Sequence, residues 1–310
     1  MNFFDAHTHL NQSDLYINRQ HHLQNFINAG GIGLVNIGVD HTYNTRGIEI
    51  ASQAQQLFPH TIVKTTIWLH PYEVAIGNIT TENMDETLNQ LYKLYKPSNK
   101  DHIVAIGEIG IDTFHPNTEH TLQLQKEIFW LQCQWARTLG LPIVIHSRAN
   151  RQATHEVLQD FTDLTIYFHC RPYGPDEIRT IKETYPNFYI GFCGNISYPK
   201  AENIRKSLRY LIYNNEDYPD HVISGKLKDI SSDNLPSPVN EAEQNKERGW
   251  GWGRLLIETD APYLAPQSHR GKQNTPALVK ENYTYISALL WHDISEQVIE
   301  NSKQCYNLWK

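Results

Sequence analysis

The amino-terminal segment of the chain carries two histidines at a spacing suited to sharing a metal ion. His7 and His9 stand in the stretch Phe3-Phe4-Asp5-Ala6-His7-Thr8-His9-Leu10. Successive side chains of an extended strand alternate between its two faces, so His7 and His9 point the same way, with Asp5 behind them. Two imidazoles on one face can bind one cation. The pair alone is weak evidence, because sixteen histidines occur among the 310 residues.

Four later segments each end an apolar run in residues that can bind a metal. The segments are 103–108, 142–146, 165–169 and 255–260, and they end in Glu108, His146, His169, and Glu258 with Asp260. Imidazoles and carboxylates suit Zn, Mn or Fe, whereas a site with fewer imidazoles and more water suits Mg. The same kind of residue at the same place on five strands predicts a shared metal centre.

The elements that carry these residues alternate in type along the chain. Short β-branched runs lie near residues 3–7, 32–38, 61–68, 103–108, 142–146, 164–169, 187–192 and 254–259. Helical stretches lie near residues 19–29, 43–57, 82–95, 119–139, 150–160, 174–184, 200–213, 276–290 and 295–307. Eight such units predict an α/β fold, a closed (β/α)8 TIM barrel of the metal-dependent hydrolase type. A doubly wound open sheet is the alternative, because periodicity does not reveal closure.

The domain organisation follows from the length and from one polar segment. We expect residues 1–310 to form a single domain, since α/β barrels commonly reach this length. Residues 214–252 are polar and too long for an ordinary connection. They are interpreted as a solvated insertion in preference to a substrate-binding flap, although Trp250 and Trp252 could stack on a base.

Composition limits the classes of function. The net charge of −7 and the isoelectric point near 6.1 give no general attraction to nucleic acid or to anionic membranes. A nuclease stays possible, because bound cations add local positive charge. Four widely spaced cysteines form no Cys-x-x-Cys motif, and no signal segment or membrane span is evident. These features predict a cytoplasmic protein without a membrane partner, and no obligate protein partner is inferred.

The ordered set of motifs resembles the TatD-type metal-dependent deoxyribonuclease family, within the amidohydrolase-like barrels. The matching pieces are Asp5-Ala6-His7-Thr8-His9-Leu10, Gly107-Glu108-Ile109-Gly110-Ile111-Asp112, Pro142-Ile143-Val144-Ile145-His146-Ser147-Arg148, His169-Cys170, Ile257-Glu258-Thr259-Asp260-Ala261-Pro262-Tyr263-Leu264 and His269-Arg270-Gly271-Lys272-Gln273-Asn274-Thr275-Pro276. The resemblance covers nearly the whole chain outside residues 214–252. Two positions depart from the family pattern, Trp68 in place of a glycine and Arg171 in place of an aromatic residue, and both are expected at the pocket rim.

The resemblance implies a centre of two divalent ions, Mg, Mn or Zn, with Glu108 as the bridging and catalytic carboxylate. One ion would be held by His7, His9, Glu108 and Asp260, and the other by Glu108, His146 and His169. Asp260 would also orient or deprotonate the attacking water, while a structural role at the strand end is its alternative. Asp112 could orient a ligand histidine or cap a turn.

Three kinds of residue are predicted to act around the metals. His70, at the end of the third strand, is a candidate catalytic residue that contacts the phosphate, or else a packed loop histidine. Glu258 shares a strand face with Asp260, so a catalytic role is geometrically possible. Arg148 and Arg270 follow strands five and eight, where a guanidinium could bind a phosphate or simply be solvated.

The implied function is a deoxyribonuclease that trims DNA, single-stranded or at 3′ ends, in the 3′ to 5′ direction. A second enzyme reading is hydrolysis of an amide, lactone or phosphotriester, as in other amidohydrolase-like barrels. Many of those use a lysine to bridge their metals, whereas strand four here ends in Glu108. The non-enzyme alternative is a catalytically silent barrel that binds metal or nucleic acid.

Overall fold

The computed structural model describes residues 1–114, 118–170, 174–215 and 250–308. Most of the predicted insertion at 214–252 lies outside the described residues, and so does Arg171. Within the described part, none of the helices combines the length and hydropathy that a bilayer span requires.

Eight parallel strands form one sheet in which each strand pairs with its successor in the chain. The strands are β1 (Phe3–Thr8), β2 (Gly31–Asn36), β3 (Ile62–Ile67), β4 (Ile103–Asp112), β5 (Ile143–Arg148), β6 (Ile166–Phe168), β7 (Phe188–Phe192) and β8 (Leu255–Ile257). The predicted TIM barrel is therefore confirmed. The open-sheet alternative is wrong, because a doubly wound sheet reverses its strand order and this one does not.

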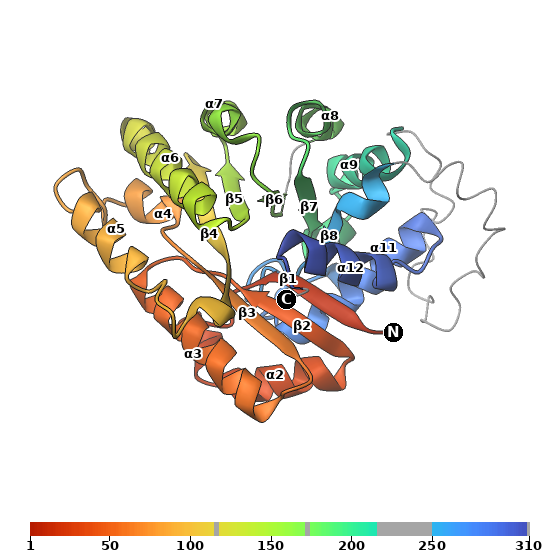
Figure 1. Cartoon of the computed structure of the whole chain (residues 1–310). Coiled ribbons are helices and arrows are strands. Elements are labelled where there is room, and N and C mark those ends of the chain that lie inside the picture. Colours follow the sequence, from red (N-terminus) through yellow and green to blue (C-terminus); the bar gives the residue numbers. More distant parts are fainter. Residues whose placement is uncertain (115–117, 171–173, 216–249, 309–310) are drawn as a thin grey trace.

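Helices surround the strands on the outside of the barrel (Figure 1). They are α1 (Ser13–Tyr16), α2 (Arg19–Asn28), α3 (His41–Leu57), α4 (Pro71–Ala75), α5 (Met84–Tyr92), α6 (Leu122–Leu139), α7 (Arg151–Leu158), α8 (Pro175–Thr184), α9 (Glu202–Tyr213), α11 (Val279–Leu290) and α12 (Ser295–Cys305). The short helices α1 and α4 were not predicted. Every other helix lies within a stretch that the sequence predicted, or extends it by a turn at most.

Alternate side chains of the strands serve two separate cores. Ile143 and Ile145 belong to the large cluster between strands and helices, whereas Val144 belongs to a smaller cluster that fills the barrel. Tyr167 of β6 and Leu256 of β8 lie in the same smaller cluster. Because residues two apart in a strand share a face, His146, His169 and Glu258 continue these inward-facing rows beyond the apolar layer. The apolar interior of the barrel thus supports the site from below.

Backbone hydrogen bonds close the seam between β1 and the segment that follows β8. The Asp260 N–H donates to the His7 carbonyl at 2.9 Å, and the His9 N–H donates to the Ala261 carbonyl at 2.7 Å. The Asp5 carboxylate accepts bonds from the Thr259 N–H at 2.8 Å and the Thr259 hydroxyl at 2.6 Å. The first and last strands therefore meet where their histidines and carboxylates stand.

Trp68 does not lie at the pocket rim as predicted. Its side chain is fully buried, with its ring 4.5 Å from that of Trp135 on α6. Its φ of 149° is one that glycine adopts readily. Asn44 stabilises this conformation by accepting a bond from the Trp68 N–H at 3.2 Å and donating one to its carbonyl at 3.0 Å. The tryptophan fills core space while retaining the backbone shape of a glycine site.

Candidate metal centre

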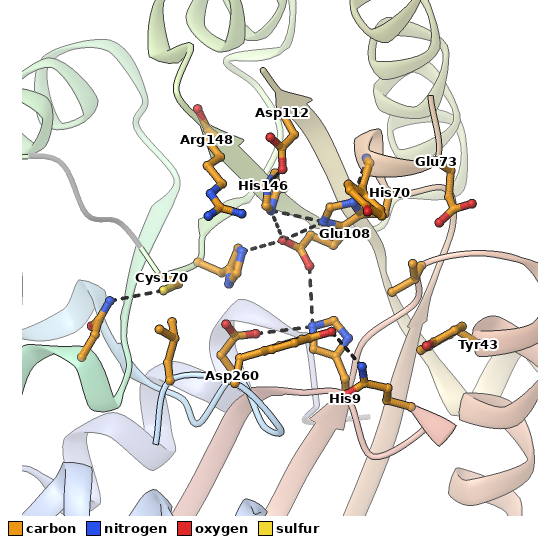
Figure 2. Close-up of a pocket in the computed structure, with 18 residues that line it drawn as sticks. His9, Tyr43, His70, Glu73, Glu108, Asp112, His146, Arg148, Cys170 and Asp260 are labelled. Carbon is orange, nitrogen blue, oxygen red and sulfur yellow. Dashed lines mark hydrogen bonds and ion pairs between the residues drawn. The ribbon is translucent and has the colours of Figure 1, made fainter. Parts of the chain in front are cut away.

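Glu108 stands at the centre of a group of histidines and carboxylates at one end of the barrel. The prediction that β4 ends at Glu108 is wrong, because the strand continues to Asp112 and its pairing with β5 shifts between Ile106 and Ile109. That irregularity lets the strand pass the site while its Glu108 side chain enters it. Glu108 is 2% exposed and lines a cavity of about 650 Å³ (Figure 2).

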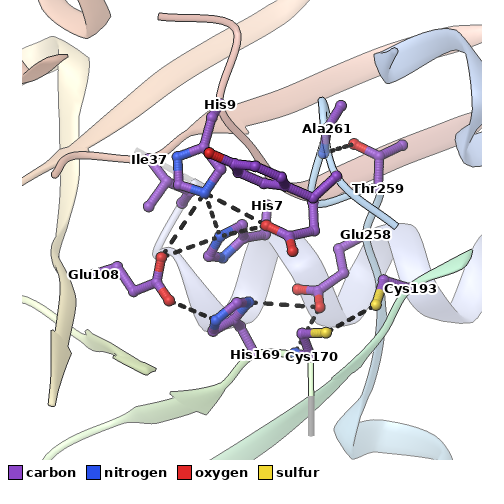
Figure 3. A network of polar contacts seen from close by, with 12 residues as sticks. His7, His9, Ile37, Glu108, His169, Cys170, Cys193, Glu258, Thr259 and Ala261 are labelled. Atoms are coloured by element: carbon purple, nitrogen blue, oxygen red, sulfur yellow. Dashed lines mark hydrogen bonds and ion pairs between the residues drawn. The ribbon is translucent and has the colours of Figure 1, made fainter. Parts of the chain in front are cut away.

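On one side of Glu108, histidines of the first strand segment meet the carboxylate of Asp260, which follows the last strand. The Nε2 atoms of His7 and His9 lie 3.3 Å apart. They lie 3.5 and 3.8 Å from Glu108 Oε2, and 3.6 and 3.4 Å from Asp260 Oδ1. The four residues implied for the first ion are therefore brought together, as Figure 3 shows for His7, His9 and Glu108.

The second side of the group faces the other oxygen of Glu108. Oε1 lies 2.6 Å from His146 Nδ1 and 2.5 Å from His169 Nε2. His70 Nε2 also approaches, at 3.6 Å from Oε1 and 3.2 Å from His146 Nδ1. The two oxygens of one carboxylate thus face different sets of imidazoles, which is the arrangement of a bridging ligand.

The residues present fit a metal centre on chemical grounds. The converging atoms are imidazole nitrogens and carboxylate oxygens. Two neutral imidazole nitrogens pointing at each other across 3.3 Å need a proton or a cation between them. Imidazole and carboxylate donors suit Zn, Mn or Fe.

The electrostatics of the group favour an anionic carboxylate beside basic imidazoles. Burial alone would raise the pKa of Glu108, but His169, His70 and His146 outweigh it and hold that pKa well below its usual value. Burial alone would lower the pKa of His169, but Glu108 outweighs it and raises that pKa to about 9. Without a metal, a proton on His169 therefore takes the place of a cation at neutral pH.

The opposite side of the centre is unprotonated. Burial, with the neighbouring His169, lowers the pKa of His7 to about 3, so its imidazole is neutral at neutral pH and can offer a lone pair to a cation. Burial would raise the pKa of Asp260, but the hydrogen bond from His9 and the electrostatic influence of the surrounding imidazoles outweigh it and lower that pKa. Asp260 is therefore ionised at neutral pH and can accept a proton.

Hydrogen bonds fix the orientation of His146 and His70. Asp112 Oδ2 lies 3.1 Å from His146 Nε2, which leaves Nδ1 of the same ring facing Glu108. His70 caps helix α4 through Nδ1, which accepts the Tyr72 N–H at 2.9 Å, so its Nε2 is directed into the site. Asp112 thus takes the predicted orienting position, and His70 lies inside the donor group.

Glu258 lies behind His169 and does not line the cavity. Its Oε1 is 3.8 Å from His169 Nδ1 and accepts the Cys170 N–H at 2.6 Å, while its Oε2 accepts the Tyr167 hydroxyl. Burial raises the pKa of Glu258 to about 7. Because it faces the outer nitrogen of a predicted ligand, Glu258 has the place of a positioning residue.

The two predicted phosphate contacts stand outside the donor group. Arg148 is exposed and lines the cavity, with its guanidinium 3.6 Å from the centre of the Phe114 ring. Arg270 is exposed and lines an adjoining pocket, with its guanidinium 4.3 Å from the centre of the Tyr198 ring. Their role in binding substrate stays a prediction.

Several residues of the site were missed by sequence reasoning. The missed residues are Tyr167 behind Glu258, Asn195, the neighbouring sulfurs of Cys170 and Cys193, and the rim tyrosines Tyr43 and Tyr263. The hydrogen bonds of Asp5 to Thr259 were missed too. Asp5 left a signal because it shares the strand face of His7, and Cys170 and Tyr263 stand within the matching motifs.

The fold and the site define a metal-dependent hydrolase of the (β/α)8-barrel type. The chain belongs to the family described as TatD related DNase, whose sequence model matches residues 4–215 and 244–307. The resemblance seen in the motifs is therefore confirmed at the level of the family.

Curated relatives carry correspondingly general names. YcfH of Escherichia coli strain K12, an "uncharacterized metal-dependent hydrolase", is 30% identical over 192 residues, which cover 61% of this chain and 56% of YcfH. The aligned part thus spans little more than half the length of that relative. YabD of Bacillus subtilis, with the same description, is 25% identical over 313 residues and covers 98% of this chain and 99% of its own.

Solved structures of the family share the fold. A TatD family hydrolase from Entamoeba histolytica superposes with a TM-score of 0.73 at 18% identity, covering 99% of this chain and 98% of that one. The TatD homologue YJJV from Escherichia coli gives a TM-score of 0.72 at 18% identity and covers 98% of both chains. At 18% sequence identity these structural similarities show a shared barrel fold only.

Proposed function

We propose that the protein is a two-metal deoxyribonuclease that removes nucleotides from the 3′ ends of single-stranded DNA. The observation that carries the proposal is a pair of adjoining pockets, each with an arginine, beside the donor group around Glu108. The cavity of about 650 Å³ holds Arg148, and the second pocket, of about 530 Å³, holds Arg270 and Lys200. Asn195 and Leu264 border both pockets. A strand with several phosphates can span both, whereas a small lactone or cyclic amide fills only one.

The rim of the cavity suits bases as well as phosphates. Tyr263 is 51% exposed and Tyr72 is 36% exposed, and both line the cavity with Tyr43. Aromatic side chains that keep an open face can stack on unpaired bases without regard to sequence. These contacts supply local affinity for a single strand although the chain as a whole is acidic.

The proposal gives a role to each residue around Glu108. His7 and His9 on one side of Glu108, and His146 and His169 on the other, would hold two divalent ions, which would supply positive charge beside the scissile phosphate and lower the pKa of a water molecule. Asp260, which is ionised, orients that water and accepts its proton. His70, the N-cap residue of α4, donates from Nε2 to a phosphate oxygen. Arg148 binds the same phosphate group.

The proposal is tested with metal-loaded protein and oligonucleotides labelled at either end. Removal from the 3′ end releases a labelled mononucleotide at once from a 3′-labelled strand and a ladder of shortened products from a 5′-labelled strand. Glu108→Ala should lower the rate by about a thousandfold or more, because both ions lose a ligand. Glu156→Ala, a change of an exposed glutamate on α7, is the matched control and should leave the rate unchanged.

Two results would contradict the proposal. If the protein cleaved a lactone or cyclic amide far faster than DNA, it would be a hydrolase of those compounds, as other amidohydrolase-like barrels are, and not a nuclease. DNA hydrolysis by Glu108→Ala at the wild-type rate would remove the catalytic assignment altogether.

A further inference from the structure

Two cysteines lie side by side at the edge of the metal centre. Cys170 follows β6 and Cys193 follows β7, so adjacent parallel strands bring them together at their carboxyl ends. Their sulfurs are 2.9 Å apart, as the dashed line in Figure 3 marks. Cys170 lines the cavity and Cys193 is fully buried beside it. The pair is therefore reachable from the cavity through one of its two sulfurs.

A carboxylate completes a group of three donors. Cys170 Sγ, Cys193 Sγ and a Glu258 oxygen all lie within 4.8 Å of one another. Glu258 is fixed in place by the Cys170 N–H and the Tyr167 hydroxyl. Each carboxylate oxygen has two lone pairs, so both oxygens can accept these bonds and still bind a cation. Asn195 Oδ1, 3.3 Å from Cys193 Sγ, borders the same place.

We propose that Cys170, Cys193 and Glu258 form a further cation site, which takes a thiophilic divalent ion such as Zn²⁺ or Cd²⁺. Sulfur ligands select such ions over Mg²⁺ or Mn²⁺, which prefer oxygen. Each thiol releases its proton to solvent as its sulfur binds the ion, and nothing is oxidised. Asn195 Oδ1 or a water from the cavity supplies the fourth ligand of a tetrahedral site.

The set of donors, and not the distance between the sulfurs, favours a metal over a disulfide. Two sulfurs bound to one tetrahedral zinc through bonds of about 2.3 Å lie roughly 3.8 Å apart, so the observed pair separates by about 0.9 Å on binding. A disulfide needs the sulfurs to approach to about 2.05 Å and makes no use of a carboxylate. Glu258, which also faces His169, places an oxygen near both sulfurs, and a metal site uses this third donor whereas a disulfide does not.

The thiol site shares no residue with the ligands predicted for the two catalytic ions. An ion at the thiol site would therefore be bound in addition to the two catalytic ions. The inference does not depend on the proposed nuclease activity. The two centres adjoin, because Cys170 directly follows His169 in the chain and Glu258 Oε1 lies 3.8 Å from His169 Nδ1.

The test uses the full chain, loaded with Mn²⁺ and with its four thiols reduced. Cd²⁺ is titrated in, the ultraviolet band of sulfur-to-cadmium charge transfer is recorded, and bound ions are counted by elemental analysis. Wild type should bind one cadmium equivalent with the band. Cys193→Ser, which keeps its volume and its polar contact to Asn195, should lose the band and bind that cadmium at least tenfold more weakly. Cys133→Ala, a buried cysteine of α6, is the control and should match wild type.

Three results would overturn the proposal. An unchanged band in Cys193→Ser would place the cadmium elsewhere, and Cys170→Ser provides a second variant that must lose the band as well. A reduced wild type without the band would show that the thiols hold no ion. A titration that finds two free thiols and not four in unreduced, unfolded protein would make the pair a disulfide.

Discussion

The backbone N–H of Asp260 donates a hydrogen bond of 2.9 Å to the carbonyl oxygen of His7. This bond joins residues from opposite ends of the chain and sets the distance between a predicted metal ligand and the predicted general base. The side chains show the consequence, because Asp260 Oδ1 lies 3.6 Å from His7 Nε2. Closing the barrel and assembling the site are therefore one event.

Asp5→Asn should weaken both the fold and the metal centre. Asp5 accepts the Thr259 N–H and hydroxyl. An amide oxygen accepts only one of them, so the Thr259 hydroxyl would have to accept from the NH₂ group and its own O–H would lose this acceptor. The loss of one buried hydrogen bond costs about 1–3 kcal/mol. Urea denaturation of the metal-free protein measures this free energy of unfolding, and equilibrium dialysis measures the expected loss of metal affinity.

Asp14→Asn is the control for this change, since Asp14 is an exposed residue of α1. It should leave the denaturation midpoint and the metal content as in wild type. If Asp5→Asn retained full stability, the bond between β1 and the Thr259 segment would have no role in holding the seam.

Metal affinity should rise with pH between about 7 and 9. In the metal-free protein burial disfavours the charged form of His169, but Glu108 outweighs burial and raises the pKa of His169 to about 9. A cation must displace that proton, so affinity increases roughly tenfold per pH unit until the pH passes about 9. Competition with a coloured chelator at several pH values measures the slope. An affinity for Mn²⁺ that is equal at pH 7 and pH 9 would contradict the protonation of His169.

The sequence predicted the strands well because their burial on both faces makes each a continuous apolar run. It placed the end of β4 wrongly, since Gly107 and Gly110 interrupt that run while the chain continues as a bulged strand to Asp112. Helix α4 was missed because His70 is not among the usual capping residues, although its Nδ1 caps the helix. Local sequence patterns therefore predicted the strands that carry the site more accurately than the turns and short helices that follow them.

The contacts across strands could not be predicted from local patterns. Cys170 and Cys193 are 23 positions apart, and nothing in either segment shows that the two strands are neighbours. The place of Glu258 behind His169 likewise depends on how β8 stands relative to β6. Side-chain periodicity gave the face that Glu258 shares with Asp260, but the chain turns at Asp260, with a φ of 54°. The two carboxylates face different histidines, Glu258 facing His169 and Asp260 facing His7 and His9.

Glu258 should make the metal-free protein less stable as the pH rises. Burial raises its pKa from 4.5 to about 7, so the folded state binds the proton more tightly than the unfolded state does. The free energy of unfolding therefore falls between pH 4.5 and 7. At about 1.4 kcal/mol per pH unit, the loss is on the order of 3 kcal/mol. Urea denaturation of wild type and Glu258→Gln across this range measures it, and parallel curves for the two proteins would show that Glu258 does not titrate in this interval.

Arg270→Ala should impair the hydrolysis of long strands more than that of short ones. Arg270 lines the second pocket, on the far side of Asn195 from the donor group, so only a strand that extends beyond the scissile phosphate reaches it. We expect KM for a ten-nucleotide strand to rise about tenfold while the value for a dinucleotide stays constant, because one phosphate contact is lost. The slope of log KM against log salt concentration should fall by about 0.7, which is the contribution of one phosphate contact with a single strand.

Arg179→Ala is the matched control, since Arg179 also lies over a tyrosine ring, that of Tyr210, between α8 and α9. An equal rise in KM for the dinucleotide and the long strand would place Arg270 at the scissile phosphate, and no rise for either would leave it a solvated charge.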